Sequence, residues 1–433
     1  MVLLYLLGRD FMTFNINTLG CKVNTYESSV MVDLLKNAGY KEVGLDDIAD
    51  ISIINTCSVT NTADNKSLKA IRQTRKKNKD AIIVVTGCTV QNKKDSFNDM
   101  EEVTIALGNI GKSKIVEYID EYIKNKNKII DVRDIMNTSF ESMQLNNFDR
   151  TRAFVKIEDG CNNFCTYCII PYTRGNIRCK EPRDVINEVK HLVKNGHKEV
   201  VLTGIHTGHY GFKNYSFTDL LENLVKINGL ERLRISSIEM NEITDEMLEL
   251  FKKSNILVDH LHIPLQSGSD NILKKMNRKY NKSEFIKKIN KIRSVRPDIS
   301  ITTDVIVGFP GETEEEFNEM IDTIKEINFS KLHVFPYSRR EGTPADKMKN
   351  QIDGSTKKQR VKILINLSHV LEQNYMNKFL NKEVTFIPEV YRDGYLIGHT
   401  GNYLLIKSKG TIDELYKDKV ITIKEINYPY CIG

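Results

Sequence analysis

The feature that most limits the fold of this 433-residue chain is an alternation of short apolar runs with longer amphipathic segments near its start. Strand-like runs at Thr13–Thr18, Ile51–Asn55 and Ala81–Val85 are separated by helix-like segments at Ser28–Asn37 and Asp64–Lys77. Strand, helix and strand at this period predict βαβ units, in which a helix connects two parallel strands. The first part of the chain is therefore expected to be an α/β domain built on a parallel sheet.

A cysteine follows each of these three runs: Cys21, Cys57 and Cys88. In open parallel sheets, ligands collect at the carboxyl ends of the strands, so these three residues are expected to converge although they are distant in sequence. The alternative is that they are ordinary buried cysteines, which pack as small hydrophobic side chains. Three cysteines at successive strand ends favour a shared iron–sulfur site, because thiolates hold such clusters.

Three further cysteines, Cys161, Cys165 and Cys168, lie in one short segment with spacings of x3 and x2. The ferredoxin pattern has x2 between its first cysteines, and a zinc site closes its shell with a second pair, which is absent here. The alternative is a closed site that recruits Cys179 or a distant histidine as its fourth ligand. Three thiolates can instead hold three irons of a [4Fe–4S] cluster and leave the fourth iron open.

Six strand-like runs recur through the middle of the chain, with amphipathic segments such as Arg183–Lys194, Phe217–Ile227 and Glu314–Ile327 between them. This pattern predicts a parallel (βα)6 partial barrel. Cys161, Cys165 and Cys168 would lie in the loop after the first strand of this barrel, at the end where barrels place catalytic groups. The six predicted strands are Ala153–Ile157, Glu199–Thr203, Arg232–Ser237, His260–Pro264, Ser300–Val307 and Lys331–Pro336.

The last part of the chain predicts a connecting helix at Lys357–Leu380 and then a small β-barrel of short strands separated by Gly and Asp turns. The expected domains are thus 12–125, 147–370 and 371–433. The predicted strands of the barrel are Glu383–Val390, Tyr395–His399, Tyr403–Lys407 and Lys419–Glu425.

Composition favours a soluble, cytoplasmic protein without a membrane partner. The opening run Val2–Leu7 is too short for a signal-peptide core or a membrane span. Met12 begins a segment that resembles a natural start, so residues 1–11 are interpreted as an extension or as the result of a misassigned start. Eight cysteines in a reducing compartment point to metal or catalytic roles, and the net charge of +6 permits a polyanionic partner.

The x3-x2 triad, with Tyr167 before its last cysteine, resembles the signature of the radical S-adenosylmethionine (SAM) superfamily. Across nearly the whole chain from Met12, the motifs resemble the radical SAM methylthiotransferases. These enzymes have an N-terminal three-cysteine domain, a central radical SAM domain and a C-terminal TRAM domain. The matching segments are Leu19–Ser28, Asn55–Thr60, Thr86–Cys88, Cys165–Gly175, Leu202–Ile205, His262–Ser269 and Asp304–Thr313.

Three segments resemble the branch of this family that modifies N6-threonylcarbamoyladenosine in tRNA: Lys22–Asn24, Ser236–Glu239 and His333–Ser338. The branch acting on isopentenyladenosine typically has Gln-Met-Asn at the first of these positions, and a third branch acts on a ribosomal-protein aspartate. Both remain alternatives, as does a non-catalytic, metal-stabilised RNA-binding protein. One departure is Cys179, where relatives usually have serine.

The resemblance implies two [4Fe–4S] clusters and SAM as cofactors. Cys161, Cys165 and Cys168 would hold the cluster whose open iron binds SAM, and Cys21, Cys57 and Cys88 would hold an auxiliary cluster. One SAM would methylate a sulfur on the auxiliary cluster, and a second would yield the radical that initiates attack at C2 of adenosine 37. An external low-potential electron donor is implied, and the tRNA anticodon loop would present the base flipped out or single-stranded.

Five residues are candidate SAM contacts: Tyr167, Ser237, Glu239, Gln266 and Gly308. Gly308 is expected to form a tight turn that lets the backbone approach the adenine, the alternative being a purely structural turn. Ser237, Glu239 and Gln266 are candidates for the ribose and methionine parts of SAM, or are simply polar residues at strand ends. No catalytic residue is predicted beyond the cluster ligands.

The composition of the C-terminal barrel does not indicate RNA binding, because it has no excess of positive charge. From Asn381 onward, seven Lys and Arg residues balance seven Asp and Glu residues. A basic stripe recurs at helical spacing on the predicted N-terminal helix, and the alternative is a solvated charged face. Arg174 and Arg178, near the cluster loop, are expected to contact phosphate or substrate. The stripe comprises Lys66, Lys69, Arg72 and Lys76.

Overall fold

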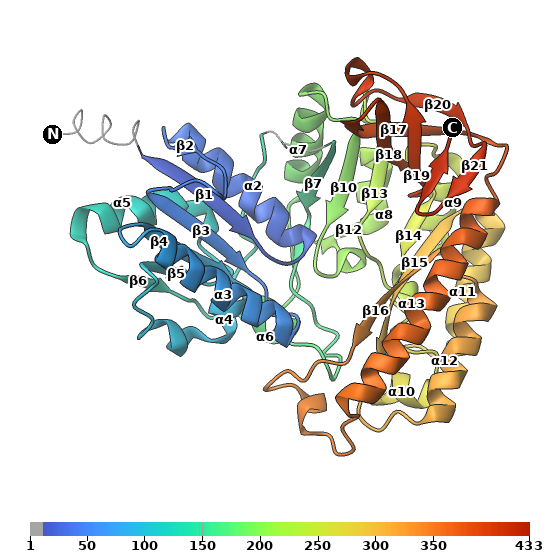
Figure 1. Cartoon of the computed structure of the whole chain (residues 1–433), viewed down its shortest axis with the longest axis horizontal. Coiled ribbons are helices and arrows are strands. Elements are labelled where there is room, and N and C mark those ends of the chain that lie inside the picture. Colours follow the sequence, from blue (N-terminus) through green and yellow to red (C-terminus); the bar gives the residue numbers. More distant parts are fainter. Residues whose placement is uncertain (1–11, 147, 149–150) are drawn as a thin grey trace.

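The computed structural model of the chain describes residues 12–146, 148 and 151–433 (Figure 1). The predicted extension at residues 1–11 and the predicted domain start at residue 147 lie outside the described residues. The described chain forms an N-terminal α/β domain, a central half barrel and a small C-terminal β-sheet domain, as the sequence predicts.

The N-terminal domain is a six-stranded parallel sheet in the order β2-β1-β3-β4-β5-β6. The central strands β3 and β4 are buried along their whole length, which explains their nearly continuous apolar sequences. One face packs against α2 and α5, and the other packs against α3 and α4. The bounds are β1 Thr13–Thr18, α2 Lys22–Asn37, β2 Lys41–Glu42, β3 Ile51–Thr56, α3 Asn61–Lys77, β4 Ile82–Gly87, α4 Cys88–Asn92, β5 Ile105–Leu107, α5 Ile115–Asn125 and β6 Ile129–Asp131.

Helix α2 begins six residues earlier than the sequence predicts, with Cys21 as its N-cap residue. Polar residues such as Asn24 and Glu27 in its first turns favoured a loop, yet both are buried. Their side chains are fully partnered within the protein, so the helix can continue through them. This early start brings the whole first turn of α2 next to Cys21.

The central domain holds six parallel strands in two three-stranded ladders, β7-β10-β13 and β14-β15-β16. A parallel bridge between Leu233 and Leu257 joins the two ladders, giving the expected half barrel. The bounds are β7 Arg152–Lys156, β8 Glu158–Asp159, α6 Ile170–Arg174, β9 Arg178–Cys179, α7 Pro182–Lys194, β10 Glu199–Thr203, β11 Gly211–Phe212, β12 Tyr215–Ser216, α8 Phe217–Leu224, β13 Arg232–Ile235, α9 Asp245–Lys253, β14 His260–His262, α10 Asp270–Lys275, α11 Lys282–Val295, β15 Ser300–Val307, α12 Glu314–Ile327 and β16 Lys331–Pro336.

Side chains of the barrel strands alternate between two faces. Apolar residues such as Val155, Leu202 and Leu233 belong to the main core with the surrounding helices. Their neighbours in sequence, including Arg234 and Lys156, therefore point to the concave side of the half barrel. The interior is thus polar, unlike the interior of a closed barrel.

The N-terminal domain lies beside the first strand of the half barrel, with α2 against β7 (Figure 1). Tyr26 of α2 joins the main core, and its hydroxyl donates to the Met143 carbonyl at 2.8 Å and to Glu188 at 2.9 Å. The two domains therefore share packing and hydrogen bonds.

The C-terminal domain is a six-stranded sheet in the order β20-β17-β18-β19-β22-β21, reached through α13, which packs against β16. The predicted strand at Tyr403 begins at Leu405, because Tyr403 has φ +65° in a turn. The run at Lys419–Glu425 divides into two strands, and the short β22 was not predicted. The bounds are α13 Gly354–Asn377, β17 Glu383–Arg392, β18 Tyr395–Thr400, β19 Leu405–Lys409, β20 Lys419–Thr422, β21 Glu425–Asn427 and β22 Tyr430–Ile432.

The predicted domain limit at residue 125 is the end of α5, whereas the limit at residue 370 lies inside α13. Strand β6, which lies beyond residue 125, still pairs in the first sheet, and α13 spans residue 370. Among the described residues, no helix has both the length and the apolar content needed to cross a bilayer.

Candidate active site

The dispersed triad converges at the ends of adjacent strands. Cys21 follows β1, Cys57 follows β3 and Cys88 follows β4. Gly20, with φ +114°, permits this approach, since a Cβ there would lie 2.7 Å from Cys57 Cβ. Burial, together with the nearby Cys88 and Cys21, raises the pKa of Cys57 to about 12. A bound metal would displace these protons from the thiols.

The local triad occupies the loop between β8 and α6. The Cys161 amide donates to the Gly175 carbonyl at 3.0 Å, and the Cys168 amide donates to the Cys165 carbonyl at 2.9 Å. Gly160, with φ +92°, lies so close to Asn176 that a Cβ would fall 2.1 Å from its carbonyl oxygen. Burial raises the pKa of both Cys161 and Cys168 to about 12.

Both triads fit a cluster better than a single zinc ion. Zinc bound by thiolates at about 2.3 Å would hold its sulfurs roughly 3.8 Å apart. Within the described chain, which includes all eight cysteines as free thiols, no three sulfurs lie within 4.8 Å of one another. In a [4Fe–4S] cluster each thiolate binds a different iron, so wider spacing is expected.

Arg278 contacts the local triad and was not predicted. Its Nη1 donates to Cys165 Sγ at 3.4 Å, and its Nη2 forms an ion pair with the Glu239 carboxylate. This contact places a positive charge next to the Cys165 sulfur. Arg278 lies more than 100 residues from the triad in sequence, so no spacing pattern could have identified it.

A second unpredicted group, His206, His209 and Glu242, lies next to Cys161. His206 Nδ1 is 3.6 Å from Cys161 Sγ, and its backbone amide donates to Glu158 at 2.7 Å. His206 Nε2 pairs with Glu242, as does His209 Nε2 at 3.0 Å. The hydrogen bond to Glu242 raises the pKa of His209. Two histidines three residues apart after strand β10 are the signal that could have predicted this group.

Two of the five predicted SAM contacts, Tyr167 and Glu239, lie near the local triad. Tyr167 packs against a cluster that contains Met276, Phe309 and Tyr337. Glu239 is tied to the triad through Arg278.

Ser237 and Gln266 are half-buried and follow β13 and β14. The backbone amide of Gln266 donates to the backbone carbonyl of Asp304 at 2.8 Å.

The turn at Gly308 has a packing role. Its amide donates to Glu312 at 2.7 Å, and a Cβ would lie 2.4 Å from Lys357 Cγ of α13. The close approach of α13 therefore explains the glycine without a ligand. Contact of the five predicted residues with SAM stays a prediction.

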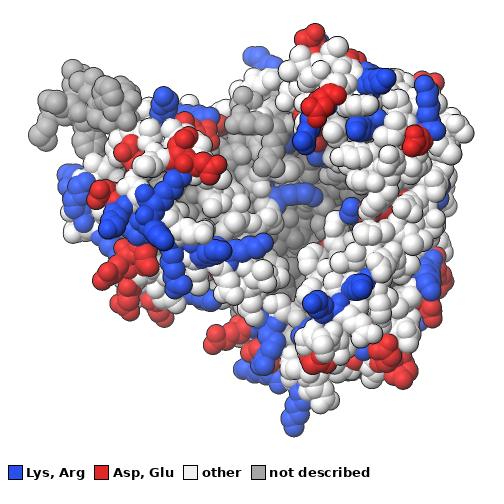
Figure 2. All heavy atoms as spheres, in the orientation of Figure 1, with Lys and Arg blue, Asp and Glu red and all other residues white. Residues whose placement is uncertain are grey.

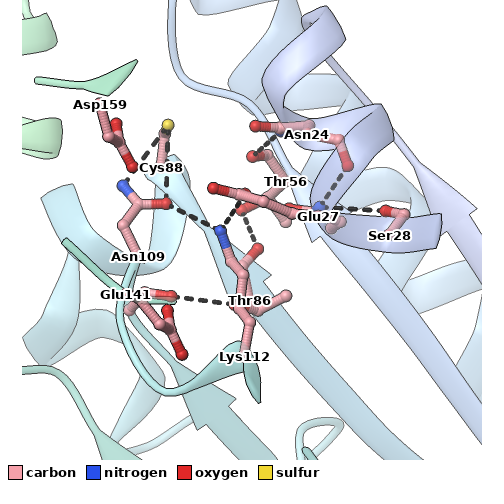
Figure 3. A network of polar contacts seen from close by, with 12 residues as sticks. Asn24, Glu27, Ser28, Thr56, Thr86, Cys88, Asn109, Lys112, Glu141 and Asp159 are labelled. Atoms are coloured by element: carbon pink, nitrogen blue, oxygen red, sulfur yellow. Dashed lines mark hydrogen bonds and ion pairs between the residues drawn. The ribbon is translucent and has the colours of Figure 1, made fainter. Parts of the chain in front are cut away.

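A buried ionic network centred on Glu27 lies near Cys88 of the dispersed triad (Figure 3). Glu27 Oε1 accepts from Lys156 Nζ at 2.8 Å and from Arg174 Nη1 at 2.7 Å, while Oε2 pairs with Lys112. Arg174 and Lys156 also reach Asp159, at 3.2 and 2.6 Å. These cations hold the pKa of Glu27 well below its usual range.

The network reaches both triads. Arg174 Nη2 donates at 2.6 Å to Asn24, whose Oδ1 is 3.8 Å from Cys21 Sγ. Asn109 Nδ2 lies 3.6 Å from Cys88 Sγ and donates at 2.7 Å to the Thr173 carbonyl, in the helix that follows Cys168. The network therefore connects two cysteines of the dispersed triad to Asp159 and Thr173, which flank the loop of the local triad.

The expectation that Arg174 and Arg178 contact phosphate is wrong. Arg174 is fully buried in the ionic network, and Arg178 is 8% exposed and donates to the Ile135 carbonyl at 3.0 Å. Two arginines after a cysteine loop looked available for RNA, but nearby carboxylates hold them inside the protein.

A hollow opens between the N-terminal domain and the concave side of the half barrel, and basic side chains reach into it (Figure 2). Lys22, directly after Cys21, is exposed. Surrounding protein and the nearby Arg234 and Arg152 lower its pKa to about 8. The hollow thus lies next to the dispersed triad.

Two family models match the chain. The Radical SAM superfamily matches residues 155–324, and the Uncharacterized protein family UPF0004 matches residues 13–108. The chain is 45% identical over 431 residues to the Threonylcarbamoyladenosine tRNA methylthiotransferase MtaB of Bacillus subtilis, covering 97% of this chain and 96% of the relative. It is 36% identical to the tRNA-2-methylthio-N(6)-dimethylallyladenosine synthase of Clostridium tetani, covering 95% and 93%.

The chain belongs to the radical SAM methylthiotransferase family. The similarity to MtaB relatives supports its threonylcarbamoyladenosine branch, as predicted. The fold also resembles the radical SAM methyltransferase TsrM of Kitasatospora setae, with a TM-score of 0.58, 14% identity and 77% and 76% coverage.

Family membership confirms that this methylthiotransferase is an enzyme and that SAM and two [4Fe–4S] clusters are its cofactors. The non-catalytic alternative is therefore excluded. The assignment of individual cysteines to each cluster remains a prediction, supported by the spacing described above.

Proposed function

We propose that this methylthiotransferase adds a methylthio group to C2 of N6-threonylcarbamoyladenosine at position 37 of tRNA, giving 2-methylthio-N6-threonylcarbamoyladenosine. The observation that carries this proposal is the 45% identity, across nearly the whole length of both chains, with a relative named for this modified base. The isopentenyladenosine and ribosomal-protein substrates remain alternatives, and relatives of the dimethylallyladenosine type are less similar.

The cofactors supply the radical and sulfur chemistry that a C2–H bond requires, because this bond has no useful acidity. In this proposal Cys161, Cys165 and Cys168 hold the SAM-binding cluster. Arg278 lies against Cys165 Sγ at 3.4 Å and stabilises that thiolate. Its ion pair with Glu239 orients the guanidinium.

Cys21, Cys57 and Cys88 hold the auxiliary cluster at the ends of β1, β3 and β4. The Glu27 network keeps this cluster at a fixed separation from the SAM-binding cluster. Correct placement of reacting groups is a large part of what a protein contributes to such a reaction.

The hollow receives a single base that is flipped out of the anticodon loop. Basic side chains on α3 contact phosphates of the RNA: Lys66, Lys69, Arg72 and Lys76 are all exposed there, and Figure 2 shows basic side chains over this helix. The enzyme works in the cytoplasm, with an external low-potential electron donor that reduces the SAM-binding cluster.

Nucleoside mass spectrometry of tRNA from cells lacking the protein tests this function. We expect the 2-methylthio form of threonylcarbamoyladenosine to disappear and its precursor to accumulate, with full restoration by the wild-type gene and none by Cys57→Ala. Unchanged levels of the 2-methylthio form would reject the assignment. Loss of 2-methylthio-isopentenyladenosine, or of a methylthio group on a ribosomal protein, would support an alternative.

A further inference from the structure

The concave side of the half barrel contains a buried arginine with unused hydrogen-bond donors. Arg234 is 1% exposed, and its Nε donates to Glu199 at 2.8 Å. Its Nη1 and Nη2 have no hydrogen-bond partner in the structure. Buried donors without partners are costly, so such groups normally meet a ligand or ordered water.

The surroundings of Arg234 are rich in positive charge. Arg152 also has an unpartnered buried nitrogen, Nη1, and the guanidinium carbons of Arg234 and Arg152 lie 3.9 and 5.3 Å from the centre of the Tyr403 ring. His260 is buried beside them, and its pKa is held well below its usual value by burial and by Arg234. The site therefore contains buried guanidinium donors that lack hydrogen-bond acceptors within the described part of the chain.

The carboxylates that face this group already have partners. Glu199 pairs with Arg234 and Arg232, Glu389 pairs with Arg152 and His399, and Asp304 lies 3.3 Å from His262 Nε2. Asp304 also attracts the Lys22 ammonium, although the two side chains form no ion pair.

Lys22 faces the same group from the N-terminal domain. It has no hydrogen bond or ion pair with the part of the chain that the structure describes, and Arg234 and Arg152 are close enough to repel its charge. Lys22 is exposed to the hollow, whereas Arg234 lies at the buried side. An exposed ammonium with no ion pair of its own, near two guanidinium groups with unused donors, marks a place for an anion.

We propose that Lys22, supported by Arg234 and Arg152, binds the threonyl carboxylate of the substrate base and so selects a charged over an uncharged adenosine modification. This inference rests on the proposed function, because threonylcarbamoyladenosine carries a carboxylate that a dimethylallyl group lacks. An apolar group would leave these cations unpaired, which is a strong basis for discrimination. The position of Lys22 next to Cys21 holds the base beside the dispersed triad.

The test measures binding of the reconstituted holoenzyme to three synthetic anticodon stem-loops. One contains threonylcarbamoyladenosine, the second contains its threonine methyl ester, and the third contains dimethylallyladenosine. The ester removes the negative charge without changing the protein or the phosphates. We expect the wild-type enzyme to bind the ester and the dimethylallyl RNA about 10- to 100-fold more weakly, as for loss of a charged hydrogen bond.

Lys22→Gln should bind the three RNAs within about threefold of one another, since the exposed lysine is not needed for folding. Lys253→Gln, an exposed lysine on the outer helix α9, is the matched control and should discriminate as the wild type does. Iron content and far-UV circular dichroism verify that the neighbouring Cys21 site and the fold are intact.

Equal binding of acid and ester by the wild type, or full discrimination by Lys22→Gln, would overturn the inference. Full discrimination by this variant would assign the recognition to phosphates or to other residues. These results are distinct from failure of the proposed function, in which the wild-type enzyme would form no methylthio product on the first RNA.

Discussion

The two cysteine triads differ in how the chain assembles them. Cys161, Cys165 and Cys168 lie within one loop, held by a few backbone hydrogen bonds. Cys21, Cys57 and Cys88 come from the ends of three strands, so their positions depend on the whole N-terminal sheet. The local triad can therefore be recognised from the spacing of its cysteines in the sequence, whereas the dispersed triad comes together only once the N-terminal sheet has formed. The Glu27 network then joins the two.

The largest expected effect is a complete loss of product when a cysteine of either triad is replaced, and SAM cleavage distinguishes the two triads. Cys57→Ala should lose the methylthio product entirely while SAM cleavage to 5′-deoxyadenosine continues, because the local triad is intact. Cys165→Ala should lose both. Iron analysis after anaerobic reconstitution should give about eight irons for the wild type and about four for each variant. Methylthio product from Cys57→Ala would remove the dispersed triad from the reaction.

The next largest effect is expected when the Glu27 network is broken. Glu27→Gln leaves Arg174, Lys112 and Lys156 without their shared carboxylate, and breaking a buried ion pair costs about 3–5 kcal/mol. Chemical denaturation should show this loss in the free energy of unfolding, and product formation should fall even when both clusters are present. The control Glu222→Gln, exposed on α8, should change the unfolding free energy by less than about 0.5 kcal/mol. A wild-type-like unfolding free energy in Glu27→Gln would contradict a stabilising network.

The same network predicts a pH dependence. The folded-state pKa of Glu27 lies well below its unfolded value near 4.5, so its contribution to stability is complete above that value. This contribution is lost as the pH falls through the folded pKa. The difference in unfolding free energy between wild type and Glu27→Gln should therefore be constant from pH 8 to 6 and shrink in acid below about pH 4.5. A difference that grows in acid would give the opposite sign and contradict the ionic account.

A smaller loss of activity is expected for a change at Arg278, which contacts a cysteine of the local triad and none of the dispersed triad within the described residues. Arg278→Gln removes a charged hydrogen bond to Cys165, so SAM cleavage should slow by about 10- to 100-fold. Electron paramagnetic resonance of the reduced SAM-binding cluster should shift, and the auxiliary cluster should not. Arg392→Gln, at an exposed arginine, is the control. Equal changes at both clusters would show that Arg278 acts on the overall fold.

The smallest effect concerns RNA binding by α3. Lys69→Gln should weaken tRNA binding a few-fold and lower the dependence of the binding constant on salt by about one ion, because one phosphate contact is lost. An unchanged salt dependence would mean that the basic stripe is a solvated face.

The sequence predicts the strands and both cysteine triads because these depend on local patterns. The strands at Thr13–Thr18, Glu199–Thr203, Ser300–Val307 and Lys331–Pro336 have the predicted bounds, since apolar alternation identifies them directly. The early start of α2 was not predicted, because buried polar residues such as Glu27 resemble loop residues until their partners are known. Two partners of Glu27, Lys156 and Arg174, come from the central domain, and the third, Lys112, lies 85 residues further along the chain.

The same limit applies to the site. Arg278 reaches the local triad from a distant segment, so no spacing identifies it. The pair of His206 and His209 is visible in the sequence, but the contact of His206 with Cys161 is not. Arg174 was expected at the surface because the sequence does not reveal the carboxylates of Glu27 and Asp159 that bury it. Sequence thus predicts the ligands of each triad, whereas the residues that orient and join the triads emerge only from the three-dimensional structure.

The central claim is that two linked triads form one methylthiotransferase site for threonylcarbamoyladenosine. Its most direct test is an anaerobic reaction of the reconstituted enzyme with SAM, a reductant and an anticodon stem-loop containing this base, analysed by nucleoside mass spectrometry. The account predicts 2-methylthio-N6-threonylcarbamoyladenosine together with 5′-deoxyadenosine from the wild type. Formation of 5′-deoxyadenosine with no methylthio product, from an enzyme carrying about eight irons, would contradict it.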